Sequence, residues 1–314
     1  MAFQILKLKE TVSFMKIRIP ALFFSAVLII GSLSSLVINQ LNWGLDFTGG
    51  TVIQMNYPQG ANLENVRLEL SAAGFENAVV QNFGSSQEVL IRVAPQDDLA
   101  PEKIGDIVVA ALQAKDSTAT MQRIEFVGPN VGEELTEQGG LAMLVALICI
   151  LIYVAMRFEW RFALGSVAAL AHDVIITLGL FSVLQLEFDL TVLAALLAVI
   201  GYSLNDTIVV SDRIRENFRK VRKGSPEEII NISLTQTLNR TIVTSLTTIL
   251  VLLALFFKGG ALIHGFATAL LMGVFIGTYS SVYIASAVAL ALGISKEDLM
   301  PPEVEKEGAD LEPL

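Results

Sequence analysis

The distribution of hydrophobic and polar residues divides the chain into six long apolar segments and one stretch with the pattern of a soluble domain. The apolar segments cover residues 19–38, 140–156, 162–184, 190–210, 241–257 and 261–292. Because a helix rises about 1.5 Å per residue, segments of this length can cross roughly 30 Å of hydrocarbon. They are apolar all round rather than on one face, which is typical of membrane helices. The sequence therefore predicts a mainly helical membrane protein with six transmembrane helices.

The stretch between the first two apolar segments, residues 39–139, predicts a small α+β domain. Alternating apolar residues indicate strands, and apolar residues three or four apart indicate helices. The expected strands are residues 51–57, 78–83, 88–93 and 121–127, and the expected helices are residues 62–73 and 101–114. Their order, β-α-β-β-α-β, is that of a ferredoxin-like unit. No Ser/His/Asp set, metal cluster or phosphate loop is recognisable in it, which favours an interaction module over an enzyme.

Composition and charge agree with this plan. Of the 314 residues, 53% are hydrophobic and only 17% are charged, which disfavours a soluble protein. The net charge of −10 comes largely from acidic residues in the inserted domain and after Ile294, where a solvated surface explains them, and nothing indicates binding to nucleic acid. Cys149 is the only cysteine, so no intrachain disulfide can form and no metal site is expected.

The lysines and arginines predict how the chain crosses the membrane. They are frequent in residues 1–18, at the turn around residues 157–161 and in the loop 211–239, and they are rare in the alternate loops. Because Lys and Arg favour the cytoplasmic side, both termini are expected in the cytoplasm. The expected plan is a cytoplasmic tail (1–18), a first helix (19–38), a periplasmic domain (39–139), helices two to six (140–292) with the cytoplasmic loop 211–239, and an acidic tail (293–314).

Several polar residues fall inside the predicted spans. Each ionisable residue there costs about 2.5–3.5 kcal/mol on insertion scales, so each calls for an explanation. The candidates lie on spans three, four and five: His172, Asp173, Ser203, Asn205, Asp206, Thr207 and Arg240. A static ion pair between Asp206 and Arg240 is one explanation. A path for a proton or another cation, with Asp206 as the titrating carboxylate, is the other.

Two further motifs lie outside this set. The first, G-L-D-F-T-G-G at residues 44–50, follows the first span and includes Gly44, Asp46, Phe47, Gly49 and Gly50. Its glycines permit tight turns and close backbone approach, so a structural hinge is as good an explanation as a functional role.

The second motif is a row of small residues on span six, which includes Gly265, Gly273, Gly277 and Ser281. Such a row lets a neighbouring helix approach closely, and it predicts helix packing rather than chemistry.

At residues 201–217 the sequence resembles a known family. The segment G-Y-S-L-N-D-T-I-V-V, continuing D-R-I-R-E-N from Asp212, is similar to the signature of the SecF branch of the SecD/SecF family. The motif at residues 44–50 resembles an element shared by SecD and SecF, and N-R-T at residues 239–241 and G-T-Y-S-S at residues 277–281 are also similar. The likeness covers nearly the whole chain. Ser211 departs from it, since the family commonly has a phenylalanine there.

The resemblance implies a function that the residues alone do not give. It implies half of an RND-superfamily transporter, located in the bacterial inner membrane, that acts with SecD beside the SecYEG channel, with YajC as a further partner. The unit would use the proton or sodium gradient to draw preproteins outward, with no cofactor and no enzymatic activity. Asp206 and Arg240 match family residues of the ion path. The basic residues of the loop 211–239 either follow the orientation rule or contact membrane lipids.

Three hypotheses therefore stand at this point. The first is an ion-coupled accessory subunit of protein export. The second is an RND-type half-transporter for a small molecule or lipid, which would require a ligand-sized apolar pocket in the inserted domain. The third is a structural assembly subunit in which Asp206 and Arg240 form a static pair.

Overall fold

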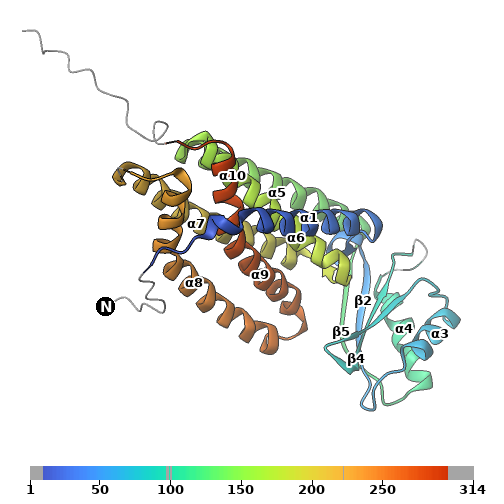
Figure 1. Ribbon diagram of the computed structural model, residues 1–314. Helices are drawn as coiled ribbons and strands as arrows, with labels where there is room; N and C mark the ends of the chain where they lie inside the picture. Colours follow the sequence, from blue (N-terminus) through green and yellow to red (C-terminus); the bar gives the residue numbers. More distant parts are fainter. Residues whose placement is uncertain (1–9, 97–98, 100, 222, 296–314) are drawn as a thin grey trace, which may run out of the picture.

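The structure, a computed structural model, consists of a helical bundle with a small α+β domain at one end (Figure 1). It describes residues 10–96, 99, 101–221 and 223–295. Most of the two predicted tails, residues 1–9 and 296–314, therefore lies outside the described residues. Within the described part, six helices are long and apolar enough to cross a membrane, as the hydrophobic pattern predicts.

The long helices follow the predicted spans in order. A 3-10 turn (Phe14–Ile17) leads into α1 (Arg18–Ile38), and after the inserted domain come α5 (Pro129–Arg157), α6 (Trp160–Leu184), α7 (Leu190–Lys220) and α8 (Pro226–Lys258). The last span consists of α9 (Ala261–Ser280), a π-helical turn (Ser281–Ala285) and α10 (Ser286–Ala291). The sequence pattern predicts one continuous helix there and gives no sign of the π turn.

The largest difference from the predicted plan is at residues 211–239, which are not a loop. Helix α7 continues to Lys220 and α8 begins at Pro226, so most of this stretch is helical. Charged side chains support the extension of α7, because Glu216 lies 2.5 Å from Lys220 and 2.9 Å from Arg213 along one helix face. Helix α8 starts with a capping box formed by Ser225 and Glu228.

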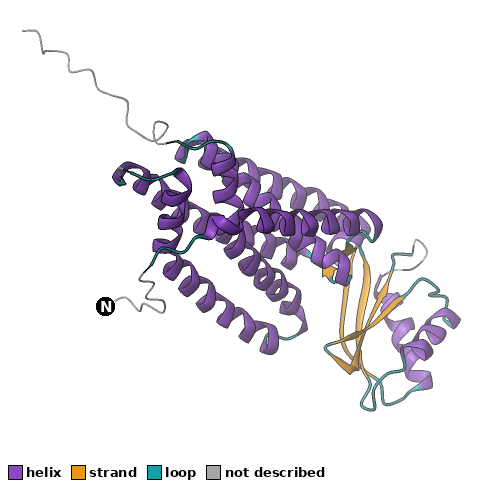
Figure 2. Ribbon diagram, in the orientation of Figure 1, coloured by secondary structure: helices purple, strands orange, loops and turns teal. Residues whose placement is uncertain are grey.

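The inserted domain has the predicted ferredoxin-like order. Its elements are β2 (Gly50–Asn56), α3 (Leu63–Ala72), β3 (Val79–Phe83), β4 (Ser85–Val93), α4 (Pro101–Lys115) and β5 (Thr120–Val127). The sheet order is β3-β4-β2-β5, and the neighbouring strands are antiparallel. Helices α3 and α4 cover one face of the sheet (Figure 2). The side chains of β2 that point to this face, Ile53 and Met55, are fully buried against Leu70 and Leu112.

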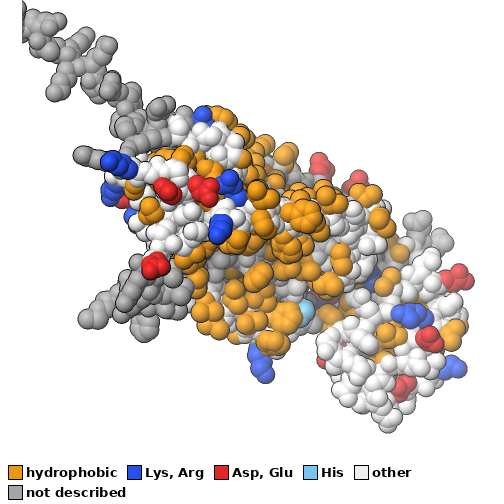
Figure 3. All heavy atoms as spheres, viewed as in Figure 1, with side chains coloured by type: hydrophobic (Ala, Val, Ile, Leu, Met, Phe, Trp, Pro, Cys, Tyr) orange, Lys and Arg blue, Asp and Glu red, His pale blue; other side chains and the backbone are white. Residues whose placement is uncertain are grey.

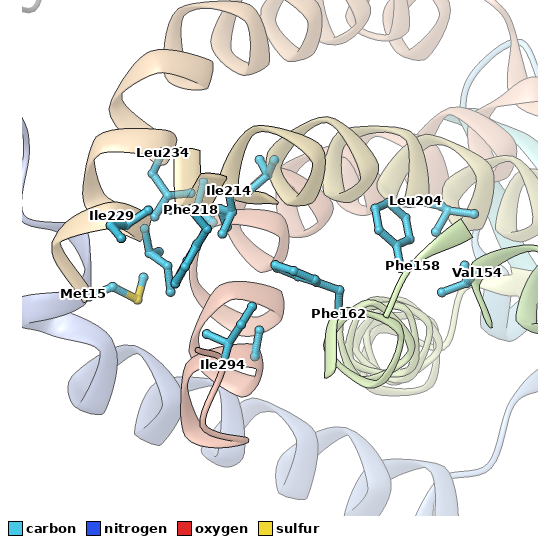
Figure 4. Close-up of a cluster of buried hydrophobic side chains, with 14 of the residues drawn as sticks. Met15, Val154, Phe158, Phe162, Leu204, Ile214, Phe218, Ile229, Leu234 and Ile294 are labelled. Atoms are coloured by element: carbon cyan, nitrogen blue, oxygen red, sulfur yellow. The ribbon is translucent and has the colours of Figure 1, made fainter. Parts of the chain in front are cut away.

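A hydrophobic cluster closes the end of the bundle far from the inserted domain. It joins the 3-10 turn, the end of α5, the start of α6, the extension of α7 and the first turns of α8 (Figure 4). Its buried members include Met15, Phe158, Phe162, Phe218 and Ile229. Hydrophobic side chains cover the outside of the helices, and most of the lysines and arginines visible on the bundle gather at this end (Figure 3).

The domain meets the bundle through the segment that carries the G-L-D-F-T-G-G motif. Strand β1 (Asn42–Trp43) pairs in parallel with β6 (Glu187–Phe188), which lies in the turn between α6 and α7. A one-turn helix, α2 (Leu45–Thr48), follows β1 and leads into β2. At Gly50 the backbone has φ +117°, and a Cβ atom would lie 2.5 Å from the carbonyl oxygen of Val93. The motif is therefore a packed joint, not an open loop.

Candidate functional site

Two carboxylates lie buried within the helical bundle. Asp173 on α6 is 1% exposed and Asp206 on α7 is 8% exposed. Neither lies within ion-pair distance of a lysine or arginine among the described residues, and hydroxyl groups surround both. Because a buried charge is costly unless it is well hydrogen-bonded, these hydroxyl groups decide what the site can do.

Asp173 accepts hydrogen bonds from two other helices. The Ser203 hydroxyl on α7 lies 2.5 Å from its Oδ2 atom, and the Ser280 hydroxyl on α9 lies 2.8 Å from the same atom. Its Oδ1 atom lies 2.8 Å from Nδ1 of His172, the preceding residue. Asp173 therefore links α6, α7 and α9 at one depth in the bundle.

Asp206 has a similar arrangement of partners. Thr241 on α8 donates to its Oδ1 atom at 2.7 Å, and Ser281 donates to its Oδ2 atom at 2.5 Å. Ser281 begins the π-helical turn that interrupts the last span. Such turns widen a helix by one residue and are frequent at functional sites. The two serines next to each other in the chain, Ser280 and Ser281, thus serve one carboxylate each.

The network extends from Asp173 to the first helix through His172. The His172 Nε2 atom lies 3.1 Å from the Ser25 hydroxyl, which lies 3.1 Å from the Tyr279 hydroxyl. Tyr279 in turn donates to the carbonyl oxygen of Ala21 at 2.8 Å. If every contact is satisfied, Ser25 donates to Tyr279 and accepts from Nε2–H of His172.

Three predicted site residues do not join this network. Arg240 and Asn205 are exposed on the outside of the bundle, and the buried Thr207 hydroxyl has no hydrogen-bond partner among the described residues. The static ion pair between Asp206 and Arg240, one of the two explanations offered above, is not among the ion pairs of the described residues. The reason is rotation: successive residues are about 100° apart around a helix, so Thr241 faces Asp206 and Arg240 faces outward.

Sequence reasoning missed several members of the network. Ser25 and Tyr279 lie within predicted spans, and neither was assigned a role. Ser281 was assigned to packing, and here it also bonds to Asp206. The available signal was the presence of hydroxyl groups in apolar segments, but serine and threonine can also bond to their own helix backbone. Ser166 does so, donating to the carbonyl oxygen of Phe162.

The row of small residues on the last span packs against α7 of the same chain. A Cβ atom at Gly265 would lie 3.0 Å from Val192, one at Gly273 would lie 2.1 Å from Val199, and one at Gly277 would lie 3.1 Å from Ser203. The prediction of a packing role agrees with these contacts. The close approach at Gly277 also brings Ser280 within reach of Asp173, because α9 could not lie as near to α7 with a larger residue there.

Fold and site together define a six-helix membrane protein with an inserted ferredoxin-like domain and a buried carboxylate and hydroxyl network. Two family descriptions match the chain: "Protein export membrane protein SecD/SecF, C-terminal" over residues 107–295, and "SecD/SecF GG Motif" over residues 34–57. The chain belongs to the SecD/SecF family.

Relatives of nearly equal length are similar along the whole chain. The protein translocase subunit SecF of Vibrio alginolyticus is 61% identical over 99% of this chain and 99% of its own length. The SecF subunit of Escherichia coli O157:H7 is 49% identical, with 96% and 94% covered, and that of Pseudomonas aeruginosa is 52% identical, with 93% and 95% covered. These lengths match the SecF branch of the family.

The fold also matches solved structures of SecDF, one of which is described as a translocon-associated membrane protein from Thermus. One crystal structure agrees with a TM-score of 0.83 at 39% identity, covering 92% of this chain. A second, called the super-membrane-facing form, agrees with a TM-score of 0.66 at the same identity and coverage. The chain spans only 39% of the SecDF chain, so it corresponds to one part of that larger protein.

Proposed function

We propose that this chain is the SecF-type subunit of a protein translocase that works with a SecD partner. In this proposal the pair uses the movement of an ion across the bacterial inner membrane to promote the passage of preproteins at the SecYEG channel. The observation that carries the proposal is the buried network in which Asp173 and Asp206 are held by neighbouring serines of one helix. No enzymatic step is involved.

The chemistry of the network fits an ion path. Protonation of Asp206 removes a buried charge and changes which of its hydroxyl partners can donate to it. The hydrogen bonds from Thr241 and Ser281 must then rearrange. This rearrangement alters the contacts of Asp206 with α8 and with the last span. Carboxylate and hydroxyl oxygens suit a proton or a sodium ion, so either is compatible with the proposal. The two SecDF forms support more than one arrangement of this fold.

Exposed polar residues on α7 and α8 support a partner subunit within the membrane. Arg240, Asn205, Thr244 and Thr247 are exposed on the outside of the bundle. A guanidinium exposed to lipid is costly, so it requires a polar or acidic partner. A second six-helix unit such as SecD would cover this face. YajC is proposed as a further partner from the family resemblance alone. The basic end opposite the inserted domain supports cytoplasmic termini.

The two alternatives receive less support. A small-molecule transporter would need a ligand-sized apolar pocket in the inserted domain. The hollow on the open face of its sheet, lined by Val52, Phe83 and Leu90 among others, has a cavity volume of only about 30 Å³, far below the roughly 300–1,000 Å³ of typical ligand sites. A static assembly subunit was expected to pair Asp206 with Arg240, and Thr241 and Ser281 hold Asp206 instead.

The test replaces Asp206 with asparagine in vesicles that contain the chain with its partner subunits. Ion coupling predicts that gradient-dependent export is lost while assembly and gradient-independent export remain. Asp212→Asn is the matched control, since Asp212 is a carboxylate on the same helix that pairs with Arg157 at 2.5 Å outside the network. Normal export by Asp206→Asn would refute ion coupling through this residue. Lost assembly would favour the structural role, and solute uptake without an export defect would favour the transporter.

A further inference from the structure

The contact between Asp46 and the first residue of α7 joins two distant parts of the chain. We infer that Asp46 is a positioning residue that fastens the inserted domain to α7, the helix that carries Asp206, so that movement of the helix is passed to the domain. The expected effect of Asp46 on export rests on the proposed function. The attachment of the domain to α7 by Asp46 rests only on the contacts between them.

The first contact is at the start of α7. The backbone N–H of Leu190 donates to Oδ2 of Asp46 at 3.0 Å, across 144 positions of sequence. The first N–H groups of a helix have no partner within the helix, and this end carries a partial positive charge. A carboxylate supplied from another segment therefore makes a favourable, directional contact there.

Close packing holds the Asp46 segment in place. The backbone N–H of Gly44 donates to the carbonyl oxygen of Phe188 at 2.8 Å. A Cβ atom at Gly44 would lie 3.0 Å from Cβ of Asp189, so only glycine permits this approach without displacement. On the other side, a Cβ atom at Gly132 of α5 would lie 3.0 Å from the backbone nitrogen of Gly49. The motif at residues 44–50 is therefore packed between the start of α7 and the start of α5.

The same segment is fixed to the sheet of the inserted domain. Leu45 is buried in a cluster with Val52 of β2 and Leu90 of β4. Arg92 of β4 donates to the carbonyl oxygen of Trp43 at 3.1 Å and pairs with Glu187 at 2.6 Å. A continuous set of contacts thus runs from the sheet through α2 and Asp46 to α7.

Helix capping alone does not explain Asp46, because α7 has its own cap. Asp189 is the residue directly before the helix, and its Oδ1 atom accepts from the N–H of Val192 at 2.8 Å. The two carboxylates thus serve different N–H groups of one helix start. Asp189 comes from the adjoining residue, whereas Asp46 comes from the domain joint. The difference provides a matched control.

The experiment measures the position of the domain and export in the same preparations. Spin labels are placed at two exposed positions, Leu68 of the domain and Leu250 of α8, in the full chain assembled with its partners. Asp46→Ala is expected to broaden the distance distribution between the labels and to reduce gradient-dependent export at least fivefold, with gradient-independent export unchanged. Asp46→Asn retains an acceptor oxygen. It is expected to keep most of the narrow distance distribution and most of the gradient-dependent export. Asp189→Ala, which removes only the local cap, is expected to keep the narrow distribution.

The outcomes separate this inference from the proposed function. An unchanged distance distribution in Asp46→Ala, or an equal broadening in Asp189→Ala, would overturn the attachment. A broadened distribution with full gradient-dependent export would overturn its role in coupling. If Asp206→Asn exports normally while Asp46→Ala still broadens the distribution, the proposed function fails and the attachment stands.

Discussion

Ser280 and Ser281 are neighbours in the chain, yet they donate hydrogen bonds to different buried carboxylates. Ser280 bonds to Asp173 on α6 at 2.8 Å, and Ser281 bonds to Asp206 on α7 at 2.5 Å. Adjacent residues of a helix point about 100° apart, which lets one turn serve two neighbouring helices. A single peptide unit of the last span therefore connects the hydrogen-bond partners of the two carboxylates.

This relationship predicts the effect of removing one hydroxyl. Ser281→Ala takes away one of the two hydrogen bonds to Asp206, and a bond to a charged group contributes about 1.5–3 kcal/mol. We expect gradient-dependent export to fall about tenfold or more, with the subunit still assembled. Ser166→Ala is the control, because the equally buried Ser166 hydroxyl bonds to its own helix backbone. An equal loss in both variants would indicate a general packing effect.

The contact between the last span and α7 predicts a compensating pair of substitutions. A Cβ atom at Gly273 would lie 2.1 Å from a methyl group of Val199, so Gly273→Ala should destabilise the bundle by about 1–3 kcal/mol. Val199→Ala removes the two methyl groups that clash and leaves only Cβ of residue 199 at 2.9 Å, so the double variant should recover part of the loss. Thermal unfolding in detergent, arranged as a double-mutant cycle, measures the coupling. Strictly additive effects would contradict direct contact between these two positions.

Glu187 predicts a pH dependence at the joint between domain and bundle. Burial raises the pKa of the Glu187 carboxyl above its ordinary value, the charge of Asp189 acts in the same direction, and Arg92 opposes the shift. A raised pKa in the docked state means that docking binds a proton. The contribution of Glu187 to docking is therefore full below the ordinary glutamate pKa of 4.5 and decreases as pH rises through the raised value.

Hydrogen exchange of the β1–β6 segment against pH measures this effect. Wild-type protein should become less protected as pH rises through that window. Glu187→Gln keeps an acceptor for Arg92 and cannot ionise, so its protection should not change over the same range. A parallel pH profile in the two proteins would show that Glu187 is not the group responsible.

The sequence predicts the fold better than the site, for a physical reason. A span of about 20 apolar residues or a strand with alternating residues leaves a regular pattern, and both parts of the fold follow from such patterns. Whether a residue faces the bundle interior depends on rotation by single positions. Arg240 and Thr241 illustrate this, because the charged residue faces outward and its neighbour bonds to Asp206.

Other parts of the site depend on contacts between segments far apart in sequence. The contact of His172 with Ser25 joins residues 147 positions apart, and no local pattern indicates it. The π turn at Ser281 likewise leaves no periodic signal in an apolar segment. The motif at residues 44–50 was recognisable, but its partner at Leu190 was not, because a backbone N–H group carries no sequence identity.

The position of β6 in the chain sets the order in which the molecule can be built. All four strands of the inserted sheet lie between Gly50 and Val127, so their residues are all synthesised before those of α5. Strand β6, at Glu187 and Phe188, pairs with β1 at the joint, and it is synthesised only after α5 and α6. The pairing of β1 with β6 can therefore form only after α5 and α6 have been made.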